Sequence, residues 1–336
     1  MILITGGSGY VGSHAVAELL RLNNQVVVLD NLSNSSEIAI KNLRKISDKS
    51  FDFIKADLND EKTLFEIFSK FKITTVFHFA GLKSISESIN NPSKYYYNNV
   101  VSTIKLLEVM NKFGVYEFIF SSSATVYDSC NKIPWKETDS IAQFKHPYSE
   151  NKIVIERFLK NLSKSNKKWK ISVLRYFNPL GAHSSGFIGE FKIKNNTNLM
   201  PNIIKTILGY QNVLSVYGGN YNTRDGTGVR DFIHIEDLID GHLKAKKYLE
   251  NNNGYFVWNL GAGRGFSVLE IVEKSSEIFN QKINYSIVDR RSGDLDEYYA
   301  DISKSYKELQ WKPKKNVECM IYDTYNFITK YKNNLF

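Results

Sequence analysis

The first fourteen residues, MILITGGSGYVGSH (1–14), run from a short apolar segment through a glycine-rich turn into a helical pattern. Gly6, Gly7, Gly9 and Gly12 satisfy both Gly-x-Gly-x-x-Gly and Gly-x-x-Gly-x-x-Gly. Glycines at these spacings allow a tight turn, a close approach of backbone amides to a diphosphate, and close packing of helix on strand. A glycine motif alone can be an ordinary turn, but its place directly after a first strand predicts a dinucleotide site.

Short apolar segments and helical patterns alternate through the first half of the chain. The segments 2–5, 25–29, 51–56, 74–80, 117–121 and 171–174 are rich in Val, Ile and Phe, as is typical of parallel strands covered on both faces. Helical periodicity predicts helices over 10–22, 61–71, 94–113 and 147–163. This order predicts an α/β fold with a doubly wound parallel sheet of the Rossmann type.

The pattern changes after about Gly181, where the chain becomes polar and glycine-bearing. Further on, it predicts helices over 199–209, 268–279 and 317–331, a short strand around 213–217 and a buried strand over 255–260. We therefore expect a dinucleotide-binding domain over residues 1–180 and a smaller α/β substrate-binding lobe over 181–336. The chain is expected to return to the first domain near 230–265.

The composition, with 42% hydrophobic and 24% charged residues, is that of a globular protein. The formal charge of +9 comes from scattered lysines without zinc-finger spacing or an RNP-type motif, so we expect no nucleic-acid partner. Two cysteines are too few for a disulfide framework and indicate a cytoplasmic location. The histidines show no metal-ligand spacing, and no apolar stretch reaches the roughly 18 residues that cross a bilayer, so neither metal nor membrane is expected.

Acidic residues close the second and third predicted strands. Asp30 ends QVVVLD (25–30), where a carboxylate can accept both hydroxyls of an adenosine ribose. The same carboxylate repels a 2′-phosphate, and no arginine directly follows it, so the sequence favours NAD over NADP. For Asp57 in FIKADLND (53–60) two interpretations stay open, a helix cap and an acceptor for the adenine amino group.

The segment KHPYSENK (145–152) places Tyr148 four residues before Lys152. Pro147 suits the first turn of a helix, so Tyr148 is expected beside the positive end of the helix dipole with Lys152 on the same face. These charges and an oxidised nicotinamide are expected to lower the phenol pKa from about 10. A shift of about three units equals roughly 4 kcal/mol and would make Tyr148 a base that takes an alcohol proton as hydride leaves. The spacing alone also fits an ordinary surface pair.

The segment SSSATVY (121–127) follows the fifth predicted strand, so its hydroxyls are expected at the carboxyl end of the sheet, where ligands bind. A serine there can form a hydrogen bond with the reacting oxygen. Serine-rich strand ends are also common in ordinary turns. The glycine turn, the strand-end serine and Tyr-x-x-x-Lys in this order are more specific together than any one of them.

With these motifs, the chain resembles the extended short-chain dehydrogenase/reductase superfamily and, within it, the UDP-glucose 4-epimerase family, over nearly its whole length. Further segments that carry the resemblance are LDNLSNS (29–35), FHFAGLKS (77–84), YYYNNV (95–100), RYFNPLGAH (175–183), NLMP (198–201), DGTGVRDFIHIEDLIDGH (225–242), NLGAGRGFSVLE (259–270) and RRSGDLDEYYAD (290–301). The resemblance implies an NAD-dependent isomerase of galactose metabolism that interconverts UDP-galactose and UDP-glucose through a 4-keto sugar. It also implies NAD held as a prosthetic group, and a homodimer formed through helices 94–113 and 147–163.

The resemblance also implies roles for individual residues: Tyr148 as base, Lys152 as its electrostatic partner and Ser123 as the hydroxyl that bridges to the sugar. The implied NAD contacts are these three with Gly6, Gly9, Tyr10, Val11, Gly12, Asp30, Asn31, Leu32, Ser33, Asn34, Ser35, Asp57, Leu58, Phe79, Ala80, Gly81, Leu82, Lys83, Asn98 and Phe177. The implied UDP-sugar contacts are Ser123, Tyr148, Asn178, Asn198, Leu199, Val216, Tyr217, Arg230, Arg291, Asp294 and Tyr298. Guanidinium groups such as those of Arg230 and Arg291 offer paired donors to a diphosphate, although either residue alone could form a surface ion pair.

Two places depart from the common family pattern. Asp128 stands where a glycine is frequent, and the residues between Tyr148 and Lys152, Ser149-Glu150-Asn151, are unusual. Because Glu150 adds a negative charge near Lys152, it is expected to offset part of the Lys152 charge.

Three other functions share features with this sequence. A sugar-nucleotide 4,6-dehydratase carries an Asp-Glu pair where Val126 and Tyr127 follow Thr125. The resemblance places Tyr298 at the position that controls, in this family, whether a 2-acetamido group fits. The bulk of Tyr298 therefore disfavours a UDP-N-acetylhexosamine 4-epimerase. A nonenzymatic nucleotide sensor would have lost the catalytic residues, which are all present here.

Overall fold

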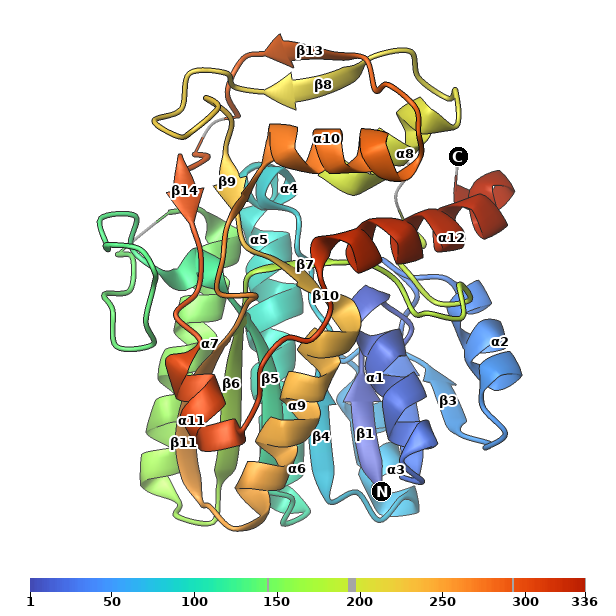
Figure 1. Cartoon of the computed structure of the whole chain (residues 1–336). Coiled ribbons are helices and arrows are strands. Elements are labelled where there is room, and N and C mark those ends of the chain that lie inside the picture. Colours follow the sequence, from blue (N-terminus) through green and yellow to red (C-terminus); the bar gives the residue numbers. More distant parts are fainter. Residues whose placement is uncertain (144, 193–197, 292, 336) are drawn as a thin grey trace.

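The structure, a computed structural model, describes residues 1–143, 145–192, 198–291 and 293–335. Its centre is a parallel sheet of seven strands in the order β11-β6-β5-β4-β1-β2-β3 (Figure 1). These strands are β1 (Ile2–Thr5), β2 (Val26–Asp30), β3 (Asp52–Lys55), β4 (Thr75–His78), β5 (Glu117–Ser123), β6 (Lys170–Tyr176) and β11 (Gly254–Leu260). The predicted doubly wound α/β fold is confirmed.

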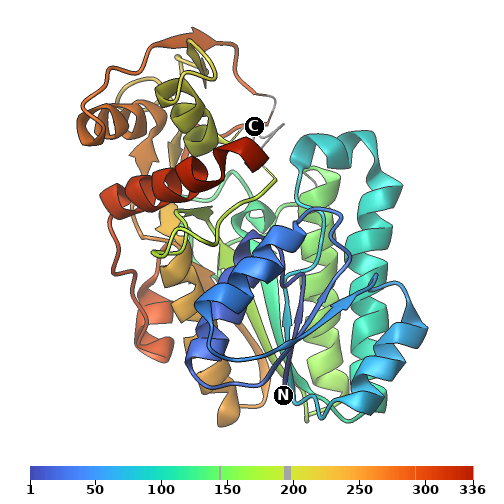
Figure 2. The same ribbon diagram turned by 90° about the vertical axis from the view of Figure 1, so that its right-hand side faces the viewer.

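Helices cover both faces of the sheet, which Figure 2 shows from its side. One face packs against α1 (Tyr10–Arg21), α2 (Glu37–Ile46) and α9 (Ile235–Glu250), and the other against α3 (Glu61–Lys70), α6 (Ser102–Lys112) and α7 (Pro147–Ser165). In β1, Ile2 and Ile4 join the first core, and Leu3 joins the second, because successive side chains of a strand point to opposite faces. Burial on both faces explains why the strands read as continuous apolar segments.

The predicted helix over 94–113 is wrong as one regular element. The structure has α5 (Pro92–Tyr95), a π-helical segment (Tyr96–Val101) and then α6. Four α-helices of the described residues had no prediction: α2, α4 (Ile85–Asn90), α9 and α11 (Ser303–Leu309). α4 has only six residues, too few for a helical repeat to be recognised, and its Ile85 and Ile89 are exposed. The Ser84 side chain caps it by accepting from the Glu87 amide.

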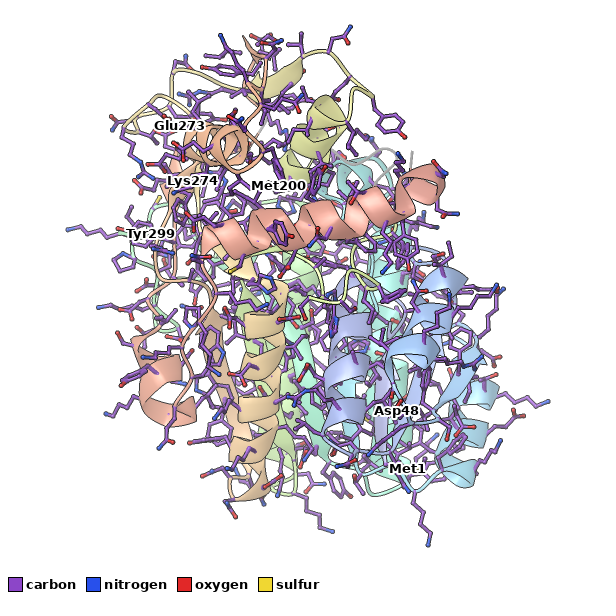
Figure 3. The ribbon with its side chains drawn as sticks, turned by 45° about the vertical axis from the view of Figure 1, so that its right-hand side comes forward. Met1, Asp48, Met200, Glu273, Lys274 and Tyr299 are labelled. Carbon is purple, nitrogen blue, oxygen red and sulfur yellow. The ribbon has the colours of Figure 1, made fainter. Side chains whose placement is uncertain are left out.

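A smaller lobe lies beyond the carboxyl ends of the strands (Figure 1). One buried cluster joins α8 (Leu199–Ile207), β8 (Leu214–Tyr217), α10 (Val268–Ile278) and α12 (Val317–Leu335). Met200 of α8 belongs to this core, and Figure 3 labels it between α10 and α12. β8 pairs with β13 (Tyr285–Val288).

Short strands connect the lobe to the large sheet. β9 (Val229–Arg230) pairs with β12 (Phe266–Ser267) and β14 (Glu297–Tyr298), and β7 (Asn178–Leu180) pairs with β10 (Phe232–His234). The chain leaves the sheet after β6, returns to it as α9 and β11, and later adds α11 (Ser303–Leu309). The division of the chain at residue 180 stays a prediction.

Candidate active site

The glycine turn lies between β1 and α1 and leaves no room for side chains. Gly6 has φ +70°, and a Cβ there would lie 2.6 Å from the Ala80 nitrogen; a Cβ on Gly12 would collide with the Gly6 carbonyl oxygen. Among the described residues, no side chain caps α1 at Gly9. The first amides of α1 therefore form a bare helix N-terminus of the kind that holds a diphosphate, so the residues present fit a dinucleotide.

The loop after β2 is organised by Asp30. One carboxylate oxygen accepts from the Ser8 amide at 3.0 Å, and the other accepts from the Leu32 amide at 2.8 Å and the Ser35 hydroxyl at 2.9 Å. These contacts fix the loop that carries Asn31 and Ser33 against the glycine turn. The acid at the end of the second strand thus lies beside the diphosphate position, as a ribose contact requires.

Asp57 is not a helix cap, because Asp60 caps α3 by accepting from the Thr63 amide. The Asp57 carboxylate instead accepts from Asn31 Nδ2 at 2.7 Å and from the Asn59 amide at 2.8 Å. Burial acts to raise the pKa of Asp57, but these hydrogen bonds outweigh burial and lower it. The interpretation of Asp57 as a helix cap is therefore wrong. Its role as an acceptor for the adenine amino group stays a prediction.

Asn99, which the sequence analysis missed, holds the loop after β4. Its side chain accepts from the Leu82 amide at 2.8 Å and donates to the Leu82 carbonyl at 3.0 Å. The predicted neighbour Asn98 donates to the Lys94 carbonyl at 2.8 Å. Both lie in the π-helical segment, and such segments are frequent at functional sites. The adjacent Asn98 and Asn99 in the sequence indicate an amide contact here, but not which of the two side chains bonds to the loop after β4.

The structure brings Ser123, Tyr148 and Lys152 together, while their roles stay predictions. Ser123 is the last residue of β5, so the serines 121–123 end the strand rather than follow it. α7 begins at Pro147 and is capped by His146, which places Tyr148 in its first turn. The Ser123 side chain lies close enough to Tyr148 to lower the pKa of its phenol. Lys152 Nζ lies 5.9 Å from the centre of the Tyr148 ring and donates to the Ser121 carbonyl at 2.6 Å.

The predicted lowering of the Tyr148 pKa is wrong for the residues of the chain alone. Burial raises the pKa of Tyr148, and the Ser123 side chain lowers it by less. Lys152 gives its short hydrogen bond to Ser121 rather than to the phenol. Burial lowers the pKa of the Lys152 ammonium to about 8, against the opposing effect of the Glu156 carboxylate, so Lys152 is mostly charged at pH 7.

Glu156, rather than the expected Glu150, is the acid that acts on Lys152. Its carboxylate pairs with Arg175 at 2.7 Å, where both side chains are at most 7% exposed, and accepts from Ser122 at 2.5 Å. These contacts join α7 to β5 and β6 beneath Tyr148. Glu150 instead acts on Tyr96, whose pKa is raised by burial and by this carboxylate. Asp128, at the position of the frequent family glycine, accepts from the Cys130 amide in a turn.

Among the predicted UDP-sugar residues are two arginines, each of which lies against an aromatic ring. Arg230 pairs with Asp294 at 3.4 Å, and its guanidinium lies 4.8 Å from the centre of the Tyr298 ring. The Arg291 guanidinium lies 4.0 Å from the centre of the Tyr217 ring. Two cations are thus held against aromatic faces, an arrangement suited to a diphosphate.

Tyr298 connects the small lobe to the large sheet. Its ring stacks on Trp135 at 5.2 Å and 9°, and lies 6.2 Å from Phe177. Burial raises the Tyr298 pKa, so the phenol is neutral, and the nearby Arg230 and Asn178 lower the pKa by less. Within the described part of the chain, Asn178 Oδ1 is buried without a hydrogen-bond partner, as expected of a group that awaits a ligand.

The remaining predicted residues lie at the edges of the same region. Asn198 and Leu199 begin α8. Val216 of β8 is buried in the core of the small lobe, so it can offer only its backbone to a ligand. Apart from Ser123, Tyr148 and Lys152, the predicted NAD contacts lie in the turn after β1 and the first turn of α1, at the end of β2, in the loops after β2, β3 and β4, in the π-helical segment, and at Phe177 after β6.

The described residues contain no group of three or more His, Cys, Asp or Glu side chains placed to hold a metal ion. Among them, no helix combines the length and the apolar composition that crossing a membrane requires.

Comparisons with known proteins agree along the whole chain. A sequence model of the NAD dependent epimerase/dehydratase family matches residues 2–261. UDP-glucose 4-epimerase of Haemophilus influenzae is 45% identical over 333 residues, which cover 99% of this chain and 98% of the relative. UDP-glucose 4-epimerase 1 of Oryza sativa subsp. japonica is 46% identical, with 98% and 94% covered.

Solved structures show the same likeness. UDP-glucose-4-epimerase of Stenotrophomonas maltophila, with bound NAD and formylated UDP-arabinopyranose, matches with a TM-score of 0.96 at 37% identity, covering 99% and 98% of the two chains. UDP-glucose 4-epimerase of Bifidobacterium longum, in complex with NAD+ and UDP, matches with a TM-score of 0.94 at 40% identity, covering 99% of each chain.

Proposed function

The chain belongs to the NAD dependent epimerase/dehydratase family, and we propose on this basis that its site interconverts UDP-galactose and UDP-glucose. The protein is an NAD-dependent 4-epimerase. The observation that carries this function is the meeting of Ser123, Tyr148 and Lys152 at the carboxyl end of the sheet, in a chain 45% identical to a UDP-glucose 4-epimerase over nearly its full length. Fold alone would not license an activity, but these side chains supply the reacting groups.

NAD is the cofactor, and the chain offers a separate place for each of its parts. The glycine turn and the first amides of α1 hold the diphosphate, and Asp30 holds the adenosine ribose. Asp57, which is hydrogen-bonded to Asn31, accepts from the adenine amino group. The loop 79–83, fixed by Asn99, lies on the other side of the glycine turn and holds the nicotinamide half with Asn98 and Phe177. Support comes from the fit of the turn, where a side chain at Gly6 or Gly12 would collide with backbone.

Proton transfer falls to Tyr148. When bound, NAD would supply the hydride acceptor and donor for C4 of the sugar, and its oxidised form would add a positive charge. Tyr148 takes the proton of the 4-hydroxyl and gives it back, with Ser123 as the hydroxyl that orients the oxygen. The ammonium of Lys152, charged at pH 7, stabilises the phenolate. The raised pKa of Tyr148 makes this charge necessary.

The nucleotide half of the substrate binds in the small lobe. Arg230 and Arg291 donate to the diphosphate, with Asp294 and Tyr217 holding the two guanidinium groups in place. Binding energy from the UDP half, remote from C4, keeps the substrate in the site while the hexose turns over.

Substrate size is set by Tyr298. The ring is stacked on Trp135 and contacts Phe177, so it forms a fixed wall rather than a mobile side chain. A fixed aromatic wall leaves little space for a 2-acetamido group, so UDP-glucose and UDP-galactose are the substrates and N-acetylated UDP-hexoses are excluded.

Assembly and location extend the proposal. The chain forms a homodimer through the face made by α4, the π-helical segment and α7, where Ile89 and Tyr97 are 58% and 52% exposed. The protein works in the cytoplasm, which is supported by the two exposed free cysteines Cys130 and Cys319.

The test of function is incubation of the purified protein with UDP-galactose and no added cofactor. Proton NMR of the anomeric region should show UDP-glucose forming until the two sugars reach equilibrium. Absence of UDP-glucose, even after NAD is added, would refute the proposal.

A further inference from the structure

The segment 181–192, called the strap here, leaves β7 and passes over the large sheet on the side of α1 and α2 (Figure 1). Its beginning and middle are firmly attached. The Tyr10 hydroxyl donates to the Gly181 carbonyl at 2.7 Å, and Asn42 Nδ2 of α2 donates to the Phe187 carbonyl at 2.8 Å. Ile188 is fully buried in the core of the large sheet. The strap is therefore part of the folded core up to Ile188.

Its last residues make two polar contacts with opposite sides of the glycine turn. Glu190 pairs with Lys83 at 2.6 Å, with 18% and 52% of the two side chains exposed. Lys192 Nζ donates to the Ser33 carbonyl at 2.6 Å. Lys83 lies in the loop after β4, and Ser33 lies in the loop after β2.

The order of the sheet gives these contacts their meaning. β1 lies between β4 and β2, so the glycine turn after β1 lies between the loops that carry Lys83 and Ser33. Two strap residues that are only two positions apart contact both loops. A dinucleotide whose diphosphate rests on the glycine turn would have to leave past a segment attached on both sides.

We propose that Glu190 and Lys192 fasten the strap across bound NAD and slow its release, a role that rests on the proposed function because it takes NAD as the occupant. The two contacts are made by side chains at the end of an otherwise anchored segment. Breaking them opens the strap locally and leaves the buried Ile188 in place. Both residues act on release of the cofactor and neither touches the reacting carbon.

The experiment measures exchange of bound NAD. Purified holoprotein is mixed with an excess of adenine-labelled NAD, and the label retained on the protein is counted over time. Lys192→Met removes one contact and Glu190→Gln removes the charge of the other. Each should speed exchange roughly three- to tenfold, as expected for the loss of one polar interaction.

Matched controls separate the strap from general effects. Lys192→Arg keeps a donor for the Ser33 carbonyl and should exchange like the wild type. Glu318 of α12 forms a similar ion pair, at 2.8 Å, with Lys274 of α10, which Figure 3 labels. Glu318→Gln breaks this pair away from the strap, and the variant should also exchange NAD like the wild type. Thermal midpoints of the ligand-free variants should match the wild type, which excludes misfolding.

Two results would overturn the proposal. One is unchanged exchange in both Lys192→Met and Glu190→Gln. The other is slower exchange in Glu190→Gln, which would mean that Glu190 competes with the diphosphate for Lys83.

Measuring the retained NAD label requires no turnover of substrate. The epimerase function and the role of the strap can therefore be refuted separately. A wild-type protein that retains NAD but leaves UDP-galactose unchanged would refute the epimerase function alone. Normal epimerisation with exchange insensitive to both substitutions would refute the strap alone.

Discussion

Replacing Lys152 by methionine removes the ammonium that lies 5.9 Å from the centre of the Tyr148 ring. At an effective dielectric of about 20, a charge at that distance stabilises a phenolate by about 3 kcal/mol. This energy corresponds to a shift of about two units in the phenol pKa, or about 100-fold in the fraction ionised. Turnover of UDP-galactose by Lys152→Met should therefore fall about 100-fold at pH 7.

The pH profile identifies the cause. The Lys152 pKa is about 8, so its charge is present below that pH and is lost above it. The gap between wild type and Lys152→Met should be widest below pH 8 and should close as pH rises beyond it. Lys152→Gln retains a donor for the Ser121 carbonyl without a charge, so its profile should follow that of the methionine variant.

The assay is initial rate against pH, with NAD content checked for each variant. Lys160→Met, on the exposed side of α7, is the matched control and should keep the wild-type profile. A Lys152→Met profile parallel to the wild type at every pH would refute the electrostatic role of Lys152.

Three further outcomes are expected. Arg175→Met leaves the buried Glu156 carboxylate without its 2.7 Å partner and should lower the free energy of unfolding by about 3 to 5 kcal/mol in urea titrations, whereas Arg21→Met at the surface should change it by less than about 1 kcal/mol. Tyr298→Ala removes the aromatic wall, so turnover of UDP-N-acetylgalactosamine relative to UDP-galactose should rise by about tenfold or more; an unchanged ratio would contradict the gating role. Burial lowers the pKa of His14 from 6.5 to about 3, so the unfolded chain binds a proton that the folded chain does not, and stability present above pH 6.5 is lost as pH falls toward 3. By pH 5 the loss from this group should be about 2 kcal/mol in urea titrations, and His14→Gln should reduce the pH dependence by that amount.

The sequence predicts features that depend on local patterns. Continuous apolar segments indicate strands covered on both faces, and Pro147 places Tyr148 in the first turn of α7. The helical repeat also distinguishes the acids around Lys152: Glu156 lies four residues on, on the same face, whereas Glu150 lies two residues before, on another face. The error about Glu150 could have been avoided from spacing alone.

Features that depend on distant contacts were beyond the sequence. Asn99 is hydrogen-bonded to Leu82, 17 residues away, and lies in a π-helical segment that the helical periodicity of the sequence does not predict. The strap joins Glu190 to Lys83 over 107 positions, so no local pattern contains it. The raised pKa of Tyr148 comes from burial, which the Tyr-x-x-x-Lys spacing does not encode.

The base itself is tested most directly by Tyr148→Phe. The ring and its packing remain, while the phenol hydroxyl, whose pKa the Ser123 side chain lowers, is lost. With NAD still bound, conversion of UDP-galactose to UDP-glucose should fall by about 100-fold to 10,000-fold, the range of general acid–base catalysis. Turnover close to that of the wild type, in a variant that retains its NAD, would contradict the assignment of Tyr148 as the group that moves the proton.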